Sequence, residues 1–150
     1  MEISIASSFL PHVDPEESLA FYRDTLGMET VFEQEKEGGY LAAIVGYPGA
    51  HVRMAHLAFP GDGHRLELFQ YLEPVPRGEP GEPRDLGITH VCLLVEDIGA
   101  LHERLRSAGV DFYSDPVLVD TGANAGGVGV YLRDPDGITL ELFQRPKEGA

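Results

Sequence analysis

The sequence has no tryptophan and only one cysteine, Cys92, among its 150 residues. A single cysteine excludes an internal disulfide, and its position in the apolar run 91–95 predicts a small, buried, hydrophobic side chain. No apolar run approaches the roughly 18 residues that a membrane-spanning helix needs. Residues 1–4 also lack the basic segment of a secretory signal. These absences predict a cytoplasmic protein without a membrane partner.

Positive charge is scarce as well. The chain has 11 Lys and Arg against 25 Asp and Glu, which gives a formal net charge of −14. Such a surface repels a phosphate backbone, so we expect no nucleic-acid partner. The hydrophobic fraction of 43% is that of a globular protein. A length of 150 residues suits one ordinary domain, and we therefore expect residues 1–150 to fold as a single domain.

What the sequence does have is an internal repeat. The pentapeptide Leu-Glu-Leu-Phe-Gln at 66–70 recurs at 140–144. Repetition of this kind predicts a duplicated module. The alternation of a strand places Glu67 and Phe69 on one face of the first copy, and Glu141 on the equivalent face of the second. A carboxylate flanked by aromatic side chains on a buried face needs a partner.

The order of predicted elements is the same in both halves: a strand, a helix, then about three strands. In the first module, residues 1–73, a helix starts at the capping residue Asp14 and ends at Gly27. Strands are predicted at 3–10, 29–33, 40–45, 52–59 and 66–71. A proline-rich linker, 74–86, precedes the second module, 87–146. Its helix runs from the cap Asp97 to Gly109, and its strands are predicted at 89–95, near 111–113, and at 129–132 and 138–143.

Three motifs, Phe21–Gly27, Gly87–Val91 and Tyr131–Leu142, resemble those of the vicinal oxygen chelate superfamily. That superfamily includes glyoxalase I, methylmalonyl-CoA epimerase, extradiol dioxygenases and bleomycin resistance proteins. The resemblance covers nearly the whole chain, from 3 to 143. It implies an α+β fold of two tandem βαβββ modules that form an open, cup-shaped mixed sheet. It also implies a divalent metal held by inward residues on the first and last strands of each module.

The resemblance implies that Glu67, His90 and Glu141 are the metal ligands. His90 lies seven residues before Asp97, but the same count back from Asp14 reaches Ser7 instead of the family's usual histidine. A hydroxyl is a poor ligand for zinc, nickel or iron. The site would therefore bind one divalent ion, such as nickel, zinc, manganese or iron, weakly, use water at that position, or have lost its metal. In the last case, arginine or hydrogen bonds would neutralise the two carboxylates.

Ser7, His56, Phe69 and Tyr131 are predicted to line the substrate pocket. His12 differs from Ser7 by an odd number of residues, so in a regular strand it faces the other way, which favours a rim or turn position. The glycine-rich segment 121–129 lacks the ending of a phosphate-binding loop, and it is either a lid or a simple connection between strands.

The leading functional hypothesis is a metal-dependent lyase or isomerase of the glyoxalase or epimerase type, which moves a proton through an enolate-like intermediate. Glu141 is the first choice for the catalytic base and Glu67 the second. One alternative is a metal-free, dimeric small-molecule binding protein of the resistance type, which Ser7 favours. Another is an extradiol-type dioxygenase, which would need a second imidazole from His12 or His56. Each hypothesis implies a small-molecule ligand and a homodimer.

Overall fold

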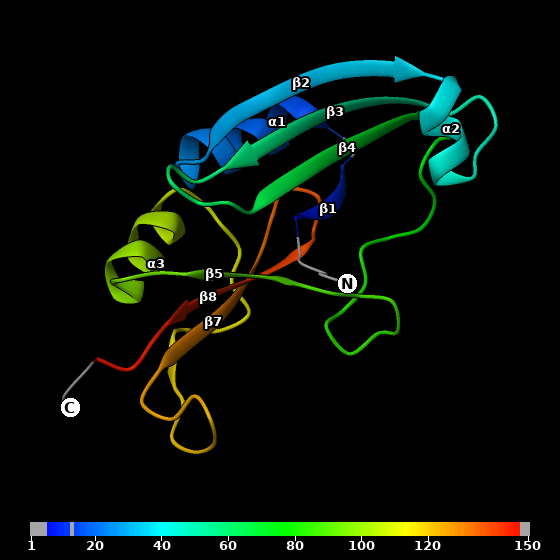
Figure 1. Ribbon diagram of the computed structural model, residues 1–150. Coiled ribbons are helices and arrows are strands. Elements are labelled where there is room, and N and C mark those ends of the chain that lie inside the picture. Colours follow the sequence, from blue (N-terminus) through cyan, green and yellow to red (C-terminus); the bar gives the residue numbers. More distant parts are fainter. Residues whose placement is uncertain (1–5, 13, 148–150) are drawn as a thin grey trace, which may run out of the picture. The chain divides into compact units, whose positions relative to one another are not determined.

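The computed structural model describes residues 6–12 and 14–147, and the chain forms two compact units, Met1–Glu79 and Pro80–Ala150. Each unit contains one four-stranded mixed sheet, which is accompanied by several helical segments in the first unit and by one helix in the second (Figure 1). The α+β class and the two tandem modules are thereby confirmed. The boundary between the units falls within the predicted proline-rich segment.

The first unit combines short helices with the strands of one sheet. Its elements are β1 (Ser7–His12), α1 (Pro15–Leu19), the π-helix η1 (Ala20–Thr25), β2 (Glu29–Glu37), α2 (Gly39–Val45), β3 (His51–Ala58) and β4 (Arg65–Glu73). The strand order is β1-β4-β3-β2, with β1 parallel to β4 and the other pairs antiparallel. Residues 3–5 of the predicted first strand lie outside the described residues.

The helix of the first unit begins where the sequence predicts. The side chain of Asp14 accepts hydrogen bonds from the backbone N–H groups of Glu16 and Glu17, at 2.9 and 3.3 Å. The last turns widen into η1, and consecutive residues Phe21 and Tyr22 are both buried. The chain then leaves the helix through Gly27, whose φ of 88° is a left-handed conformation that glycine adopts readily.

The predicted strand at 40–45 is wrong, because these residues form helix α2. Figure 1 shows α2 where β2 ends. Leu41 and Val45 are four residues apart and pack with the buried side chains of Val52 and Phe69. Gly46, with φ 74°, ends the helix. A short apolar run does not distinguish strand from helix by its periodicity alone, whereas the glycine after it is a helix-ending signal.

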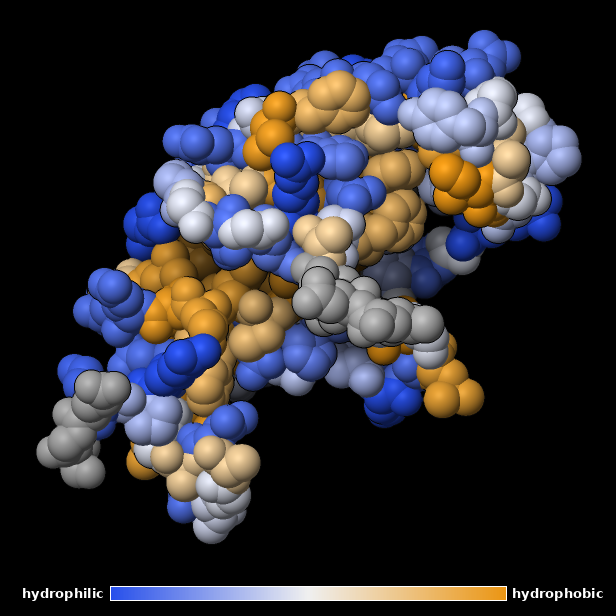
Figure 2. All heavy atoms as spheres, in the orientation of Figure 1, coloured by the Kyte–Doolittle hydropathy of each residue, from blue (hydrophilic) through white to orange (hydrophobic). Residues whose placement is uncertain are grey.

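The strand β2 forms an exposed edge of the first sheet and is longer than the predicted 29–33. Its continuation to Glu37 includes Glu35 and Lys36, and hydrophilic side chains predominate at the top of Figure 2, although Val31 and Phe32 of the same strand are also exposed. Charged side chains on an edge strand discourage pairing with a strand of another molecule. Because these residues are charged, a prediction based on apolar alternation did not include the second half of the strand.

The second unit repeats the plan with shorter strands. Its elements are β5 (Val91–Leu94), α3 (Ile98–Ser107), β6 (Val117–Leu118), β7 (Val128–Arg133) and β8 (Thr139–Gln144), in the sheet order β5-β8-β7-β6. Asp97 caps α3 by accepting the N–H of Ala100 at 2.9 Å. The predicted strand near 111–113 is reduced to one bridge, between Phe112 and Leu132. No helix in the described part of the chain is long and apolar enough to cross a membrane.

Candidate functional site

In the second unit, three chemically active side chains share one face of the sheet. Glu141 on β8 is paired with Tyr131 on the antiparallel strand β7 and with Cys92 on the parallel strand β5. Residues paired directly across strands point to the same face. The neighbouring β8 residues Leu140 and Leu142 alternate to the opposite face and are fully buried. Glu141 therefore belongs to the face that the apolar core leaves available.

His90 lies just before β5 and reaches this face. Its Nε2 atom is 3.0 Å from Oε2 of Glu141, and the two side chains are 39% and 22% exposed. The imidazole also lies against the ring of Tyr131, with 5.0 Å between ring centroids. The structure thus brings together a nitrogen and an oxygen donor, His90 and Glu141, that the sequence motifs assigned to one metal site.

The prediction that Cys92 is a buried hydrophobic residue is wrong, because Cys92 is exposed on the face of Glu141. Strand β5 alternates, so Val91 and Leu93 are the less exposed residues. Partial burial of the thiol, the charge of Glu141 and a hydrogen bond to Glu141 raise the pKa of Cys92 to about 11. Its place two residues after His90 was the available signal that it shares the site face.

Tyr131 lies beside Glu141 and carries a neutral phenol. Burial is the main cause that raises its pKa above 10.0, followed by the charge of Glu141 and that of Cys92. The phenol therefore stays protonated at neutral pH and is able to donate a hydrogen bond. This places a neutral donor, a carboxylate and an imidazole on one surface of the second unit.

The first unit holds a corresponding group around Glu67. Glu67 on β4 is paired with His56 on β3 and with Phe9 on β1. The nearest atoms of the imidazole and carboxylate, Nε2 of His56 and Oε2 of Glu67, are 3.9 Å apart. This distance is longer than a hydrogen bond. Both side chains are partly exposed and available to other ligands.

The register of the strands relates Ser7 to His90. In the first unit, Ser7 is paired with Arg65, two residues before Glu67. In the second, Val91 is paired with Leu140, so His90 lies level with the residue two before Glu141. The count from the helix caps and the strand register therefore agree that Ser7 occupies the position of His90.

Two other predicted residues have well-defined packing. Phe69 is on the face of Glu67, but it is only 7% exposed and packs in the cluster with Leu41 and Met54. The rim or turn position predicted for His12 is wrong, because His12 is buried on the opposite face of the sheet, where its Nδ1 atom is 2.7 Å from the hydroxyl oxygen of Ser18. Phe69 thus packs beside the first-unit group on the same face, and His12 contacts the helix.

The glycine-rich segment 121–129 connects β6 to β7. Two backbone hydrogen bonds of 2.8 Å join its ends, from the N–H of Val119 to the carbonyl of Gly127 and from the N–H of Gly126 to the carbonyl of Val119. The segment therefore forms a hydrogen-bonded connection between two strands, which was one of the two roles predicted for it.

A model of the Glyoxalase/Bleomycin resistance protein/Dioxygenase superfamily matches residues 4–142. The chain belongs to this superfamily. A relative named 2-epi-5-epi-valiolone epimerase, from an Actinomyces species, is 31% identical over 89% of this chain and 74% of that protein. A probable lactoylglutathione lyase from Vibrio parahaemolyticus is 28% identical over 91% of this chain and 87% of that protein.

Solved structures show the same fold. A glyoxalase family protein from Bacillus cereus matches with a TM-score of 0.84 and 20% identity, over 97% of this chain and 96% of that one. At this identity the likeness concerns the fold alone. Ser7 and His90 hold equivalent register positions in the two units, so the first unit has a hydroxyl where the second has an imidazole.

Proposed function

We propose that this protein is a divalent-metal-dependent lyase or isomerase of the glyoxalase or epimerase type, with a small substrate that presents two oxygens for chelation. The observation that supports it most directly is the 3.0 Å approach of His90 Nε2 to Glu141 Oε2 on the open face of the second sheet. The epimerase and lyase names of the relatives point to the same reaction class.

The donor set fits a divalent ion. An imidazole nitrogen and a carboxylate oxygen suit zinc, nickel, manganese or iron, and the two side chains are partly exposed. We assign His90 and Glu141 as two ligands and Glu67 as the third, with Ser7 supplying at most a weak neutral oxygen. When bound, the ion would polarise a substrate carbonyl as a Lewis acid.

The residues of the chain would then move the proton. Glu141 is the proposed base, a role that it can combine with ligation only if it leaves the ion during turnover. A carboxylate oxygen takes the proton from the carbon beside the carbonyl, and the C–H electron pair shifts toward the carbonyl oxygen. Return of the proton to the same carbon or its neighbour completes the isomerisation. Tyr131, paired with Glu141, presents a neutral hydroxyl that can donate to the oxygen gaining charge. Glu67 is the second candidate for the base.

A metal-free binding protein is the second candidate function. The 3.0 Å contact is compatible with it, because an N–H at Nε2 of His90 satisfies Glu141 without any ion. The hydroxyl of Ser7 favours it. An extradiol-type dioxygenase fits less well, since His12 faces the helix, and of the two candidate histidines this leaves His56, on the face of Glu67, to supply the second imidazole.

Elemental analysis tests the proposal. We expect about one divalent ion per chain after incubation with nickel, zinc, manganese or iron, in line with one three-ligand site. Glu141→Ala and Glu67→Ala should each remove it while the circular dichroism spectrum is unchanged. Glu103→Ala is the matched control, because Glu103 is an exposed carboxylate on α3. A wild-type protein that takes up no ion would reject the enzyme proposal in favour of the binding protein.

A further inference from the structure

A cation lies on the same sheet face as the proposed base. Arg133 is two residues beyond Tyr131 on β7, and it is paired with Thr139, two residues before Glu141 on β8. Alternation along both strands places Arg133 on the face of Glu141. The strand rise of about 3.3 Å per residue puts its Cα about 7 Å from that of Tyr131. This is a distance that the two ends of a small substrate can span.

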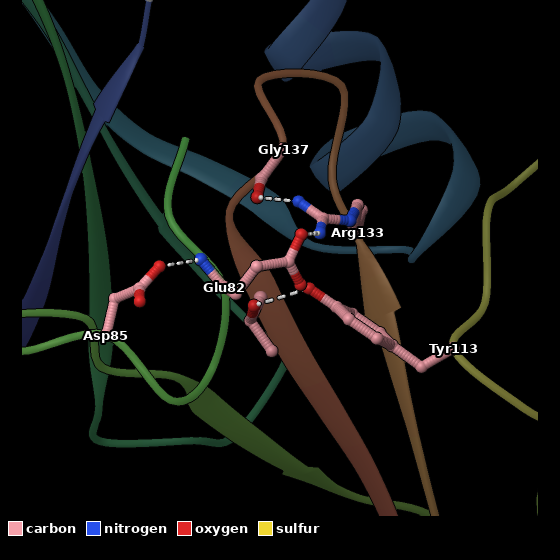
Figure 3. Close-up of polar contacts among 6 residues, drawn as sticks. Glu82, Asp85, Tyr113, Arg133 and Gly137 are labelled. Carbon is pink, nitrogen blue, oxygen red and sulfur yellow. Dashed lines mark hydrogen bonds and ion pairs between the residues drawn. The ribbon is translucent and has the colours of Figure 1, made fainter. Parts of the chain in front are cut away.

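Two contacts besides its ion pair hold the guanidinium in place. Its Cζ atom lies 4.8 Å from the ring centroid of Tyr113, and its Nη1 donates to the carbonyl of Gly137 at 3.3 Å. The hydroxyl of Tyr113 is 3.2 Å from that of Thr139, which fixes the ring over the strand ends. Figure 3 shows Arg133 between Gly137 and Tyr113. The guanidinium therefore has two contacts that do not involve an ion-pair partner.

The ion-pair partner is a carboxylate from outside the sheet. Nη2 of Arg133 donates to Oε1 of Glu82 at 2.9 Å, and the side chain of Glu82 is 50% exposed, against 23% for Arg133. Glu82 belongs to a local turn in which its own N–H donates to Asp85 at 2.7 Å (Figure 3). Exposed ion pairs contribute little free energy, so another oxyanion competes easily with Glu82.

The guanidinium also has more N–H donors than its contacts with Glu82 and Gly137 use. Of its five N–H donors, Glu82 and Gly137 each engage one among the hydrogen bonds of the described residues. An arginine fork matches the two oxygens of a carboxylate or phosphate better than a single contact does. In a chain with a net charge of −14, an anionic substrate near Glu141 needs such a cation to offset repulsion.

We propose that Arg133 is a specificity-determining residue that binds an oxyanion of the substrate, a carboxylate or a phosphate, in exchange for Glu82. Glu82 occupies the guanidinium in the absence of substrate and leaves it when the anion arrives. The inference rests on the proposed function only in assigning the reacting carbon to the neighbourhood of Glu141. It restricts the substrate class to small anionic compounds.

Anion titration tests the exchange directly. The full chain is titrated with inorganic phosphate and, separately, with malonate, and the resonances of the Arg133 Nε–H group and of the Tyr113 ring are followed by NMR. Glu82→Gln, which removes the competing charge and keeps the side-chain size, should tighten binding by about threefold to fivefold. Arg133→Ala should weaken it by about tenfold or more. A preference for phosphate or for malonate identifies which oxyanion the face accepts.

A His90→Ala variant separates this proposal from the metal site, since a bound ion also attracts anions. Binding that survives in His90→Ala and is lost in Arg133→Ala supports the role of Arg133, whatever the metal content. Unchanged binding in Glu82→Gln, or loss in His90→Ala alone, would overturn it while leaving the proposed enzyme intact. If Arg133→Ala fails to fold, Glu82→Gln still decides the question.

Discussion

The thiol of Cys92 reports on the state of Glu141. Burial, the charge of Glu141 and a hydrogen bond to it raise the thiol pKa from 9.0 to about 11, so the group stays protonated well into the alkaline range. Only the thiolate reacts readily with iodoacetamide. At pH 8 the thiolate fraction is about one in a thousand. Because the chain has a single cysteine, mass spectrometry follows this one site.

We expect alkylation of Cys92 in chelator-treated protein to be slow at pH 8 and to accelerate up to about pH 11. Glu141→Gln removes the carboxylate charge, so the midpoint should move down toward 9.0 without reaching it, because burial is the largest cause of the shift. Glu103→Gln should leave the profile unchanged. Identical profiles for wild type and Glu141→Gln would show that the carboxylate does not act on the thiol.

A substitution at Ser7 tests the metal assignment by raising the metal affinity instead of removing it. It occupies the strand position of His90, on the face of Glu67. Ser7→His should therefore raise metal affinity by about tenfold or more, since even partners outside the coordination shell are worth about 10–100-fold. Competition with a chromogenic chelator measures the change. Ser8→His is the control, because Ser8 alternates to the other face, where its hydroxyl is 2.9 Å from Nε2 of His64.

The equivalence of Ser7 and His90 was predictable from sequence because each lies seven residues before a recognisable helix cap. The same length of chain joins each residue to its cap, Asp14 or Asp97, and the register agrees with that count. The exposure of Cys92 and the position of Arg133 were not predicted. An apolar run such as 91–95 does not reveal which of its residues face the core, and an arginine in a turn motif gives no sign of its partner.

At the scale of elements, the cap of α3 is the clearest case in which one residue stabilises a helix. Asp97 accepts the N–H of Ala100, and α3 buries Leu105 in the core. Asp97→Ala should lower the free energy of unfolding by about 0.5–2 kcal/mol in urea titrations, whereas Asp97→Asn should cost much less. Asp120→Ala, at an exposed position, should have no effect. Equal losses for Asn and Ala would argue against a capping role.

Element prediction succeeded where local chemistry marks the ends and failed where tertiary contacts decide. The helices begin at the caps Asp14 and Asp97, and they end at the glycines Gly27 and Gly109. Residues 40–45 became a helix because Leu41 and Val45 cover Phe69, a contact that no local pattern contains. The two-residue strand β6 is likewise too short to have a periodicity, and its pairing with β7 defines it.

At the scale of the whole molecule, duplication divides the proposed ligands between two modules. Glu67 belongs to one unit, and His90 and Glu141 to the other. We propose a homodimer, in which a site that needs both units is completed either within one chain or between two. The two cases differ in what happens when one chain lacks Glu67 and the other lacks Glu141.

We expect the mixed dimer of Glu67→Ala and Glu141→Ala chains to recover about half of the wild-type metal content, because exchange of modules between chains is a common route to symmetric dimers. One of its two sites then combines the intact Glu67 of one chain with the intact His90 and Glu141 of the other, and the second site lacks both glutamates. Two different affinity tags isolate the mixed species, and elemental analysis gives the ion count. Each variant alone should hold none. A mixed dimer that also holds none, beside a fully loaded wild type, would place each site within a single chain.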